Sequence, residues 1–189
     1  MREQAEKKVK KMESSHRKEI EFELEVKRII EGVIAKTKAE FRAEVIGRKC
    51  LIGLSAQWQP DLVLMAHSLF DSLKPSLELA MVECKFVSDS SSEGTYWSQM
   101  SRAYMSLNDL RLVYREDLSF YLAVNRYSTG IRRDYSKIFR SIGVRLVNIN
   151  LPEERLEFES DIKKLLEETT YDEQAKKLEE VCKEYRQLS

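Results

Sequence analysis

The stretch that decides the fold runs from Gln59 to Ser88 and reads QPDLVLMAHSLFDSLKPSLELAMVECKFVS. It contains two apolar runs with the length and composition of β-strands, Pro60–Met65 and Leu77–Val87, separated by a polar loop. We expect these strands to pair as an antiparallel hairpin. Glu83 and Lys85 interrupt the second run, and burying a charge without a partner costs several kcal/mol. These two residues therefore need either a partner or a function.

Side chains alternate between the two faces of a strand, which predicts the surroundings of both charges. We expect one face to carry Leu79, Met81, Glu83, Lys85 and Val87. Cys84 then points the other way, and we interpret it as a small core hydrophobe.

The hairpin also brings Asp61, at the start of the first strand, back to the neighbourhood of Glu83. Carboxylate oxygens suit Mg²⁺, which keeps several waters and leaves positions for phosphate oxygens. A metal of this kind polarises a phosphate and lowers the pKa of a bound water. Lys85 can orient that water or stabilise the developing charge. The sequence therefore predicts a Mg²⁺ site at Asp61 and Glu83, where Mn²⁺ substitutes, with phosphate esters as the substrate class.

The flanking sequence alternates between helical and strand patterns. Apolar residues at helical spacing from Phe22 to Val33 predict a helix that begins before residue 10. Lys49–Ser55 is the expected first strand of the sheet. Further elements are expected as a helix at 96–114, a strand at 118–125, a helix at 134–141, a strand at 144–149 and helices at 153–168 and 171–187. This order predicts an α/β fold with a mixed sheet flanked by helices on both faces.

Pro60-Asp61 followed by Glu83-Cys84-Lys85 resembles the signature of the PD-(D/E)XK nuclease superfamily. The resemblance implies a restriction-endonuclease-like core of a helix, a three-stranded meander, a helix and a strand, from about Phe22 to Asn125. It also implies Mg²⁺-dependent hydrolysis of DNA, with Asp61 and Glu83 holding the metal and Lys85 assisting the attacking water. Since many relatives cut both strands with two copies, a homodimer is expected as well.

The same resemblance suggests a residue on the first helix. Phe22–Ile30 is similar to the F-E-x-x-V-x-x-L-L form of several branches, which implies that Glu23 joins the metal shell as a catalytic residue. Three other glutamates on this helix are alternatives: Glu19, Glu25 and Glu31.

The helix after the motif strand suggests one more residue. Members often carry a glutamine there that faces the site, and Gln99 stands at that place in TYWSQMSRAY. Some branches continue as Q-x-x-x-Y, whereas Tyr104 here is one residue too far. The departure puts membership of that sub-branch in doubt.

Charge is balanced overall but unevenly distributed. The 189 residues carry 32 basic and 32 acidic side chains, so bulk charge does not indicate a nucleic-acid binder. Basic residues nevertheless gather between Arg111 and Arg145, and the helix at 131–142 offers four candidate phosphate contacts: Arg132, Arg133, Lys137 and Arg140. An ordinary solvated face of a helix is the alternative interpretation.

Composition limits the remaining possibilities. Three widely spaced cysteines without a C-x-x-C pair indicate neither a disulfide framework nor a zinc site. No apolar run approaches the ~18 residues of a membrane span, so we expect an intracellular, cytoplasmic protein without membrane contact or an organic cofactor. We divide the chain into a helical extension at 1–18, a nuclease core at 19–151 and a helical tail at 152–189, where Pro152 follows the last strand.

Two other functions fit the same sequence. The chain could be a catalytically silent nucleic-acid-binding or scaffolding member of the fold, acting through its terminal helices. It could also be a coiled-coil structural protein in which the motif is accidental. An intact Asp61, Glu83 and Lys85 set favours the nuclease.

Overall fold

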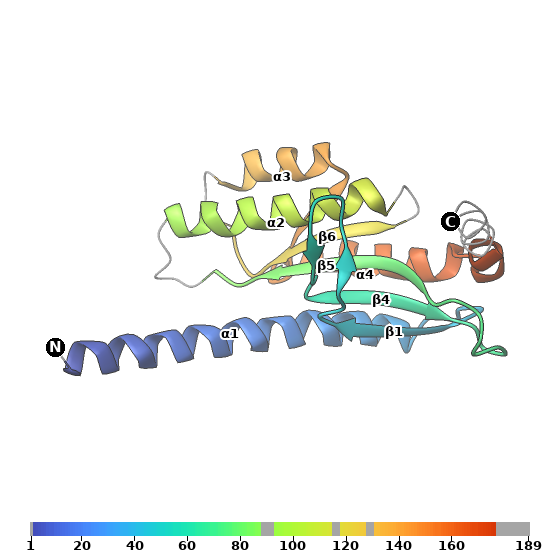
Figure 1. Cartoon of the computed structure of the whole chain (residues 1–189), viewed down its shortest axis with the longest axis horizontal. Helices are drawn as coiled ribbons and strands as arrows, with labels where there is room; N and C mark the ends of the chain where they lie inside the picture. The colour runs from blue at the N-terminus through green and yellow to red at the C-terminus, as the bar shows by residue number, and fades with distance from the viewer. Residues whose placement is uncertain (1, 88–92, 115–117, 128–130, 177–189) are drawn as a thin grey trace.

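The computed structural model describes residues 2–87, 93–114, 118–127 and 131–176, without the side chains of 2–15, 93–97, 99 and 131–134. Its main sheet has five strands in the order β1-β4-β5-β6-β7 (Figure 1). The elements follow in the order α1 (Arg2–Ile34), β1 (Arg42–Gly47), β2 (Leu51–Ile52), β3 (Gln57–Trp58), β4 (Leu62–His67), β5 (Leu77–Lys85), α2 (Glu93–Val113), β6 (Ser119–Val124), α3 (Ile131–Ser141), β7 (Val144–Asn148) and α4 (Pro152–Glu168).

Helices cover both faces of this sheet. On one face α1 and α4 contribute Phe22, Val26, Phe158 and Ile162 to a buried core. On the other face α2 and α3 pack a second core against the same strands (Figure 1). The predicted α/β architecture, a mixed sheet flanked by helices, is confirmed at this level.

The strand pairing places the QPD segment beside the motif strand. β4 and β5 form the expected antiparallel hairpin, with Leu62 opposite Val82, and β1 pairs antiparallel with the other side of β4. β6 then lies parallel to β5, with Leu122 opposite Glu83, and β7 lies parallel to β6. A parallel neighbour requires a crossover, which α2 supplies between β5 and β6.

The prediction of the first strand was wrong. Lys49–Ser55 does not join the main sheet: β2 and β3 form a separate two-stranded hairpin, and β1 occupies the edge of the sheet instead. β1 reads RAEVIG and has one buried residue, Val45, so its composition is too polar to stand out in the sequence. Gly53 makes the hairpin possible, because a Cβ there would lie 2.1 Å from the Asp109 carboxylate.

The assignment of Leu79 to the face of Glu83 was also wrong. The β4–β5 register shifts at this point, since Leu64 pairs with Ala80 and Met65 with Glu78. Leu79 is therefore an extra residue in a β-bulge, and both Leu79 and Ala80 pack into the core under α1 and α4. Beyond the bulge the alternation holds, with Met81 in the opposite core.

The terminal helices belong to the packed structure in the part that is described. α1 is one 33-residue helix that runs past residue 18, where the sequence analysis placed a division. α4 begins at Pro152 and buries Phe158, Ile162 and Leu166. Residues 171–176 are helical, and the rest of the helix expected at 171–187 lies outside the described residues. None of the described helices is long and apolar enough to cross a membrane.

Candidate functional site

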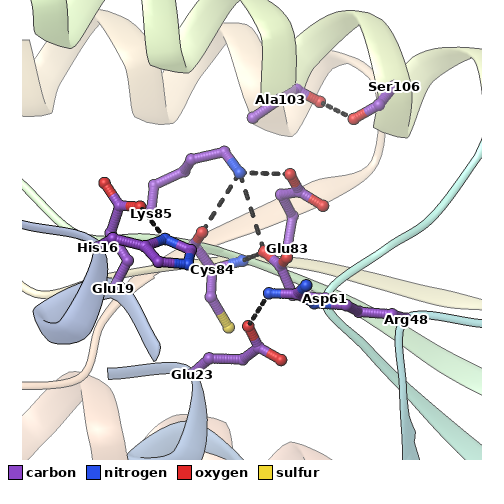
Figure 2. A network of polar contacts seen from close by, with 10 residues as sticks. All are labelled: His16, Glu19, Glu23, Arg48, Asp61, Glu83, Cys84, Lys85, Ala103 and Ser106. Carbon is purple, nitrogen blue, oxygen red and sulfur yellow. Dashed lines mark hydrogen bonds and ion pairs between the residues drawn. The ribbon is translucent and has the colours of Figure 1, made fainter. Parts of the chain in front are cut away.

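Asp61, Glu83 and Lys85 lie together where β4 begins and β5 ends. The Lys85 Nζ lies 3.8 Å from the Asp61 Oδ2 and donates a hydrogen bond to the Glu83 carboxylate (Figure 2). Lys85 also donates to the Cys84 carbonyl at 3.3 Å, and the Cys84 backbone N–H donates to the Asp61 carboxylate at 2.7 Å. The structure thus brings together the three residues that the motif singled out.

These groups line a cavity of about 330 Å³. Their side chains are 23%, 14% and 21% exposed for Asp61, Glu83 and Lys85, so each is largely removed from water. The remaining lining comes from several elements: His16, Glu19, Ile20 and Glu23 of α1, then Arg48, Trp58, Gln59 and Pro60, then Cys84 and Phe86, and Arg102, Ser106 and Leu110 of α2. Both α1 and α2 therefore contribute to the lining of the cavity.

Burial and mutual charge shift the protonation of the site. Burial raises the pKa of Glu83, and the negative charge of Asp61 raises it further, while the Lys85 ammonium lowers it. Burial lowers the pKa of Lys85, but the charges of Glu83 and Asp61 outweigh it, so this pKa is raised. Lys85 therefore stays an ammonium at neutral pH, and it acts as a hydrogen-bond donor and a positive charge.

Glu23 of α1 is a partly buried glutamate that lines the same cavity. Its side chain is 20% exposed and pairs with the Arg48 guanidinium at 3.6 Å. Burial raises the pKa of Glu23, and the Asp61 charge adds to the rise. The negative charge of Asp61 thus acts on the Glu23 carboxyl.

The three alternative glutamates differ from Glu23. Glu19 lines the cavity but is more exposed and lies 3.7 Å from His16. Glu31 forms a surface ion pair with Lys27, and Glu25 does not line the cavity. Glu23 is therefore the best placed of the four.

The residues present fit a hard divalent cation with an incomplete protein shell. In the part of the chain that the structure describes, no three His, Cys, Asp or Glu side chains gather closely enough to hold a metal by themselves. Asp61 and Glu83 supply carboxylate oxygens, which Mg²⁺ and Mn²⁺ favour. The Lys85 ammonium forms ion pairs with both carboxylates and supplies the positive charge near them. Water and phosphate oxygens would have to complete the shell of a bound metal.

Cys84 has the structural role that the sequence analysis gave it. Its side chain packs against the core on the α1 side of the sheet, away from the Lys85 ammonium (Figure 2). Burial and the charges of Asp61, Glu83 and Glu23 raise the pKa of the thiol well above its usual range. Cys84 is thus a neutral thiol and a poor nucleophile.

None of the other candidate residues lines the cavity with a described side chain. Gln99 is on α2, which does line the cavity through Arg102, but its side chain is outside the described residues. The same holds for the side chains of Arg132 and Arg133 on α3. Lys137 is exposed, and Arg140 lines a different cavity beside Glu153 and Glu154, so neither lines the candidate site.

Arg48, Trp58 and Arg102 are among the cavity residues that the sequence analysis did not single out. Arg48 has a positive φ of 52°, which is uncommon for a residue other than glycine. The Trp58 indole N–H donates to the Asp109 carboxylate at 2.5 Å. Trp58 could have been proposed from the sequence because it lies close to the PD motif. Arg48 and Arg102 have no comparable motif beside them.

Comparisons with known proteins add little to this site. No protein-family model matches the chain, and a search of curated proteins finds no match. Among solved structures, the chain is similar to a protein of unknown function, AF1548, with a TM-score of 0.41 and 15% sequence identity. That similarity covers 71% of this chain and 63% of the other, so it spans less than two thirds of that protein.

Proposed function

We propose that this protein is a Mg²⁺-dependent nuclease of the PD-(D/E)XK superfamily that hydrolyses DNA phosphodiester bonds. The observation that carries the proposal is the convergence of Asp61, Glu83 and Lys85 in the lining of one cavity. Two carboxylates and an ammonium in a largely buried place need a compensating ligand. A divalent cation and an anionic phosphate together supply one.

The sheet supports the restriction-endonuclease-like core that this superfamily implies. β1, β4 and β5 form an antiparallel meander, preceded by α1 and followed by α2 and the parallel strand β6. This is the implied order of helix, three strands, helix and strand. The small β2–β3 hairpin is an insertion within the meander.

Each residue then has a separate task in the hydrolysis. Asp61 and Glu83 would hold the cation, which when bound polarises the phosphate and acidifies a coordinated water. Lys85, protonated because of its two carboxylate neighbours, donates hydrogen bonds that orient the attacking water and stabilise negative charge on the phosphoryl oxygens. Glu23 does not gather with Asp61 and Glu83 into a three-carboxylate site, so its carboxyl would support the cation from a greater distance, through its negative charge.

Cleavage assays test the proposal. Purified protein is incubated with plasmid, single-stranded and branched DNA in Mg²⁺, in Mn²⁺ and in a chelator. We expect cutting that depends on the metal and disappears in Lys85→Ala, while the unfolding curve of this variant stays cooperative. Full cutting by purified Lys85→Ala would refute the assignment of the site.

One observation favours a second function, that of a catalytically silent nucleic-acid-binding or scaffolding protein. The Lys85 ammonium already neutralises part of the charge of both carboxylates without any metal. Titration with Mn²⁺ separates the two functions, because a nuclease binds the ion and loses this affinity in Asp61→Ala, whereas a silent protein shows no such affinity. A homodimer remains part of the proposal for the nuclease, and sedimentation of the full chain tests it.

A further inference from the structure

The candidate site is recessed between two helices that cover opposite faces of the sheet. The cavity is lined by His16, Glu19 and Glu23 of α1 and by Ser106 of α2 (Figure 2). Arg102 of α2 also belongs to its lining. The cavity of about 330 Å³ is at the lower end of pockets that hold a single small ligand, and it has room for a nucleotide-sized group.

One wall of the cavity carries an aromatic ring held in place by hydrogen bonds. The Trp58 indole N–H donates to the Asp109 carboxylate at 2.5 Å. The same carboxylate accepts from the Ser55 N–H at 2.9 Å and from the Ser55 hydroxyl at 2.8 Å, which ties the β2–β3 hairpin to α2. Trp58 is thereby fixed as a rigid, partly exposed lining residue. Aromatic rings of this kind are platforms on which unpaired bases stack.

Two arginines stand in different walls of the same cavity. Arg48 follows β1 and is 60% exposed, although it pairs with Glu23 at 3.6 Å. Arg102 on α2 is exposed and forms no ion pair with any described side chain. Guanidinium groups bind phosphate oxygens with several donors at once. Each of the two arginines is therefore a candidate contact for a phosphate of a ligand in the cavity.

We propose that the cavity binds single-stranded DNA, with one base stacked on Trp58 and the neighbouring phosphates held by Arg48 and Arg102. The inference rests on the proposed function for the hydrolysis step, and it specifies the substrate as an unpaired strand. Binding is measured separately from cutting, so the two ideas fail in different experiments.

The binding experiment uses the full chain in a chelator, which prevents metal-dependent cutting. Anisotropy of labelled oligo(dT) is compared with that of a hairpin duplex, and tryptophan emission is followed in a Trp97→Phe background, because the chain has two tryptophans. We expect at least ~10-fold tighter binding of the single strand and a change of Trp58 emission at saturation. Trp58→Leu should weaken binding by roughly 5- to 100-fold, the range that corresponds to the loss of one stacked base.

An arginine variant tests the inference without altering the β2–β3 hairpin that contains Trp58. Arg102→Gln changes an exposed side chain, and it should weaken binding and reduce the salt slope by about 0.7, the effect of one phosphate on a single strand. Arg155→Gln, on α4 and outside this cavity, is the matched control and should change neither quantity. Equal affinity for duplex and single strand, wild-type binding by Trp58→Leu and Arg102→Gln, or unchanged Trp58 emission would each overturn the inference.

The outcomes for binding and for cutting are separable. Single-strand binding with the expected variant effects, but no cutting in Mg²⁺, would support this inference and refute the nuclease. Metal-dependent cutting of duplex and single strand at equal rates would support the nuclease and refute this inference.

Discussion

The backbone N–H of Cys84 donates a hydrogen bond to the carboxylate of Asp61 at 2.7 Å. This bond joins the residue before β4 to the end of the motif strand, across the antiparallel pair in which Leu62 faces Val82. It fixes the Asp61 carboxylate on the side of Lys85, 3.8 Å from the ammonium. One contact between backbone and side chain thus sets the spacing of the candidate centre.

Two substitutions of Asp61 should separate its charge from this hydrogen bond. Asp61→Asn keeps an oxygen that can accept from Cys84 but removes the negative charge, so we expect cutting to fall ~100-fold or more with little change in stability. Asp61→Ala removes both, and we expect it to lose about 1 kcal/mol of unfolding free energy in addition. Cleavage rates and urea unfolding of both variants are the measurements. Equal stability of the two would show that the Cys84 contact contributes nothing.

The hairpin was predictable because its signals are local. The two apolar runs of the Gln59–Ser88 stretch and the polar loop between them predict both strands and bring Asp61 back to Glu83. The bulge at Leu79 was not predictable, because Leu79 and Ala80 are both apolar and either could occupy the same face. β1 was missed because an edge strand buries little and keeps a polar composition.

The walls of the cavity depend on tertiary packing alone. Arg48, Trp58 and Arg102 lie far apart in the chain or in different elements, and only the packing of α1 and α2 on the sheet brings them to one cavity. Asp109 is a comparable case: its partners Ser55 and Trp58 are more than fifty residues away, and no local pattern links them.

Removal of the Lys85 charge should make stability depend more strongly on pH. The ammonium lowers the pKa of Glu83, so in Lys85→Gln this pKa rises further above its value in the unfolded chain. The stabilisation linked to a raised pKa is complete below the unfolded pKa of about 4.3 and is lost as the pH rises through the folded pKa. We therefore expect Lys85→Gln to be more destabilised, relative to wild type, at pH 7.5 than at pH 5.

Urea unfolding at the two pH values measures this difference. Lys74→Gln is the control, because Lys74 forms an exposed pair with Asp172 whose loss should change stability little at either pH. A Lys85→Gln variant whose destabilisation does not change between pH 5 and pH 7.5 would contradict the coupling between Lys85 and Glu83.

Divalent cations should stabilise the protein, and acid should weaken this effect. A ligand at 100 times its dissociation constant adds about 2.7 kcal/mol, which for a chain of this size raises Tm by roughly 5–10 °C. Binding requires ionised carboxylates, and burial raises the pKa of both Glu83 and Glu23. The Mn²⁺-induced rise in Tm should therefore shrink as the pH falls, starting above the pH at which a free glutamate is protonated. Asp61→Asn should show no rise at any pH.

Glu23 should contribute to cation binding, whereas its neighbours on α1 should not. Its carboxyl is mostly buried and lines the cavity beside Arg48. Burial and the Asp61 charge raise the pKa of this carboxyl. We expect Glu23→Gln to weaken Mn²⁺ affinity by about 10- to 100-fold, the usual effect of removing a supporting group of a metal site. Glu31→Gln removes only an exposed pair with Lys27 and should leave the affinity unchanged.

Glu19→Gln decides the remaining alternative, because Glu19 also lines the cavity. Calorimetric titration of the three variants gives the affinities, and a larger loss in Glu19→Gln than in Glu23→Gln would transfer the role to Glu19.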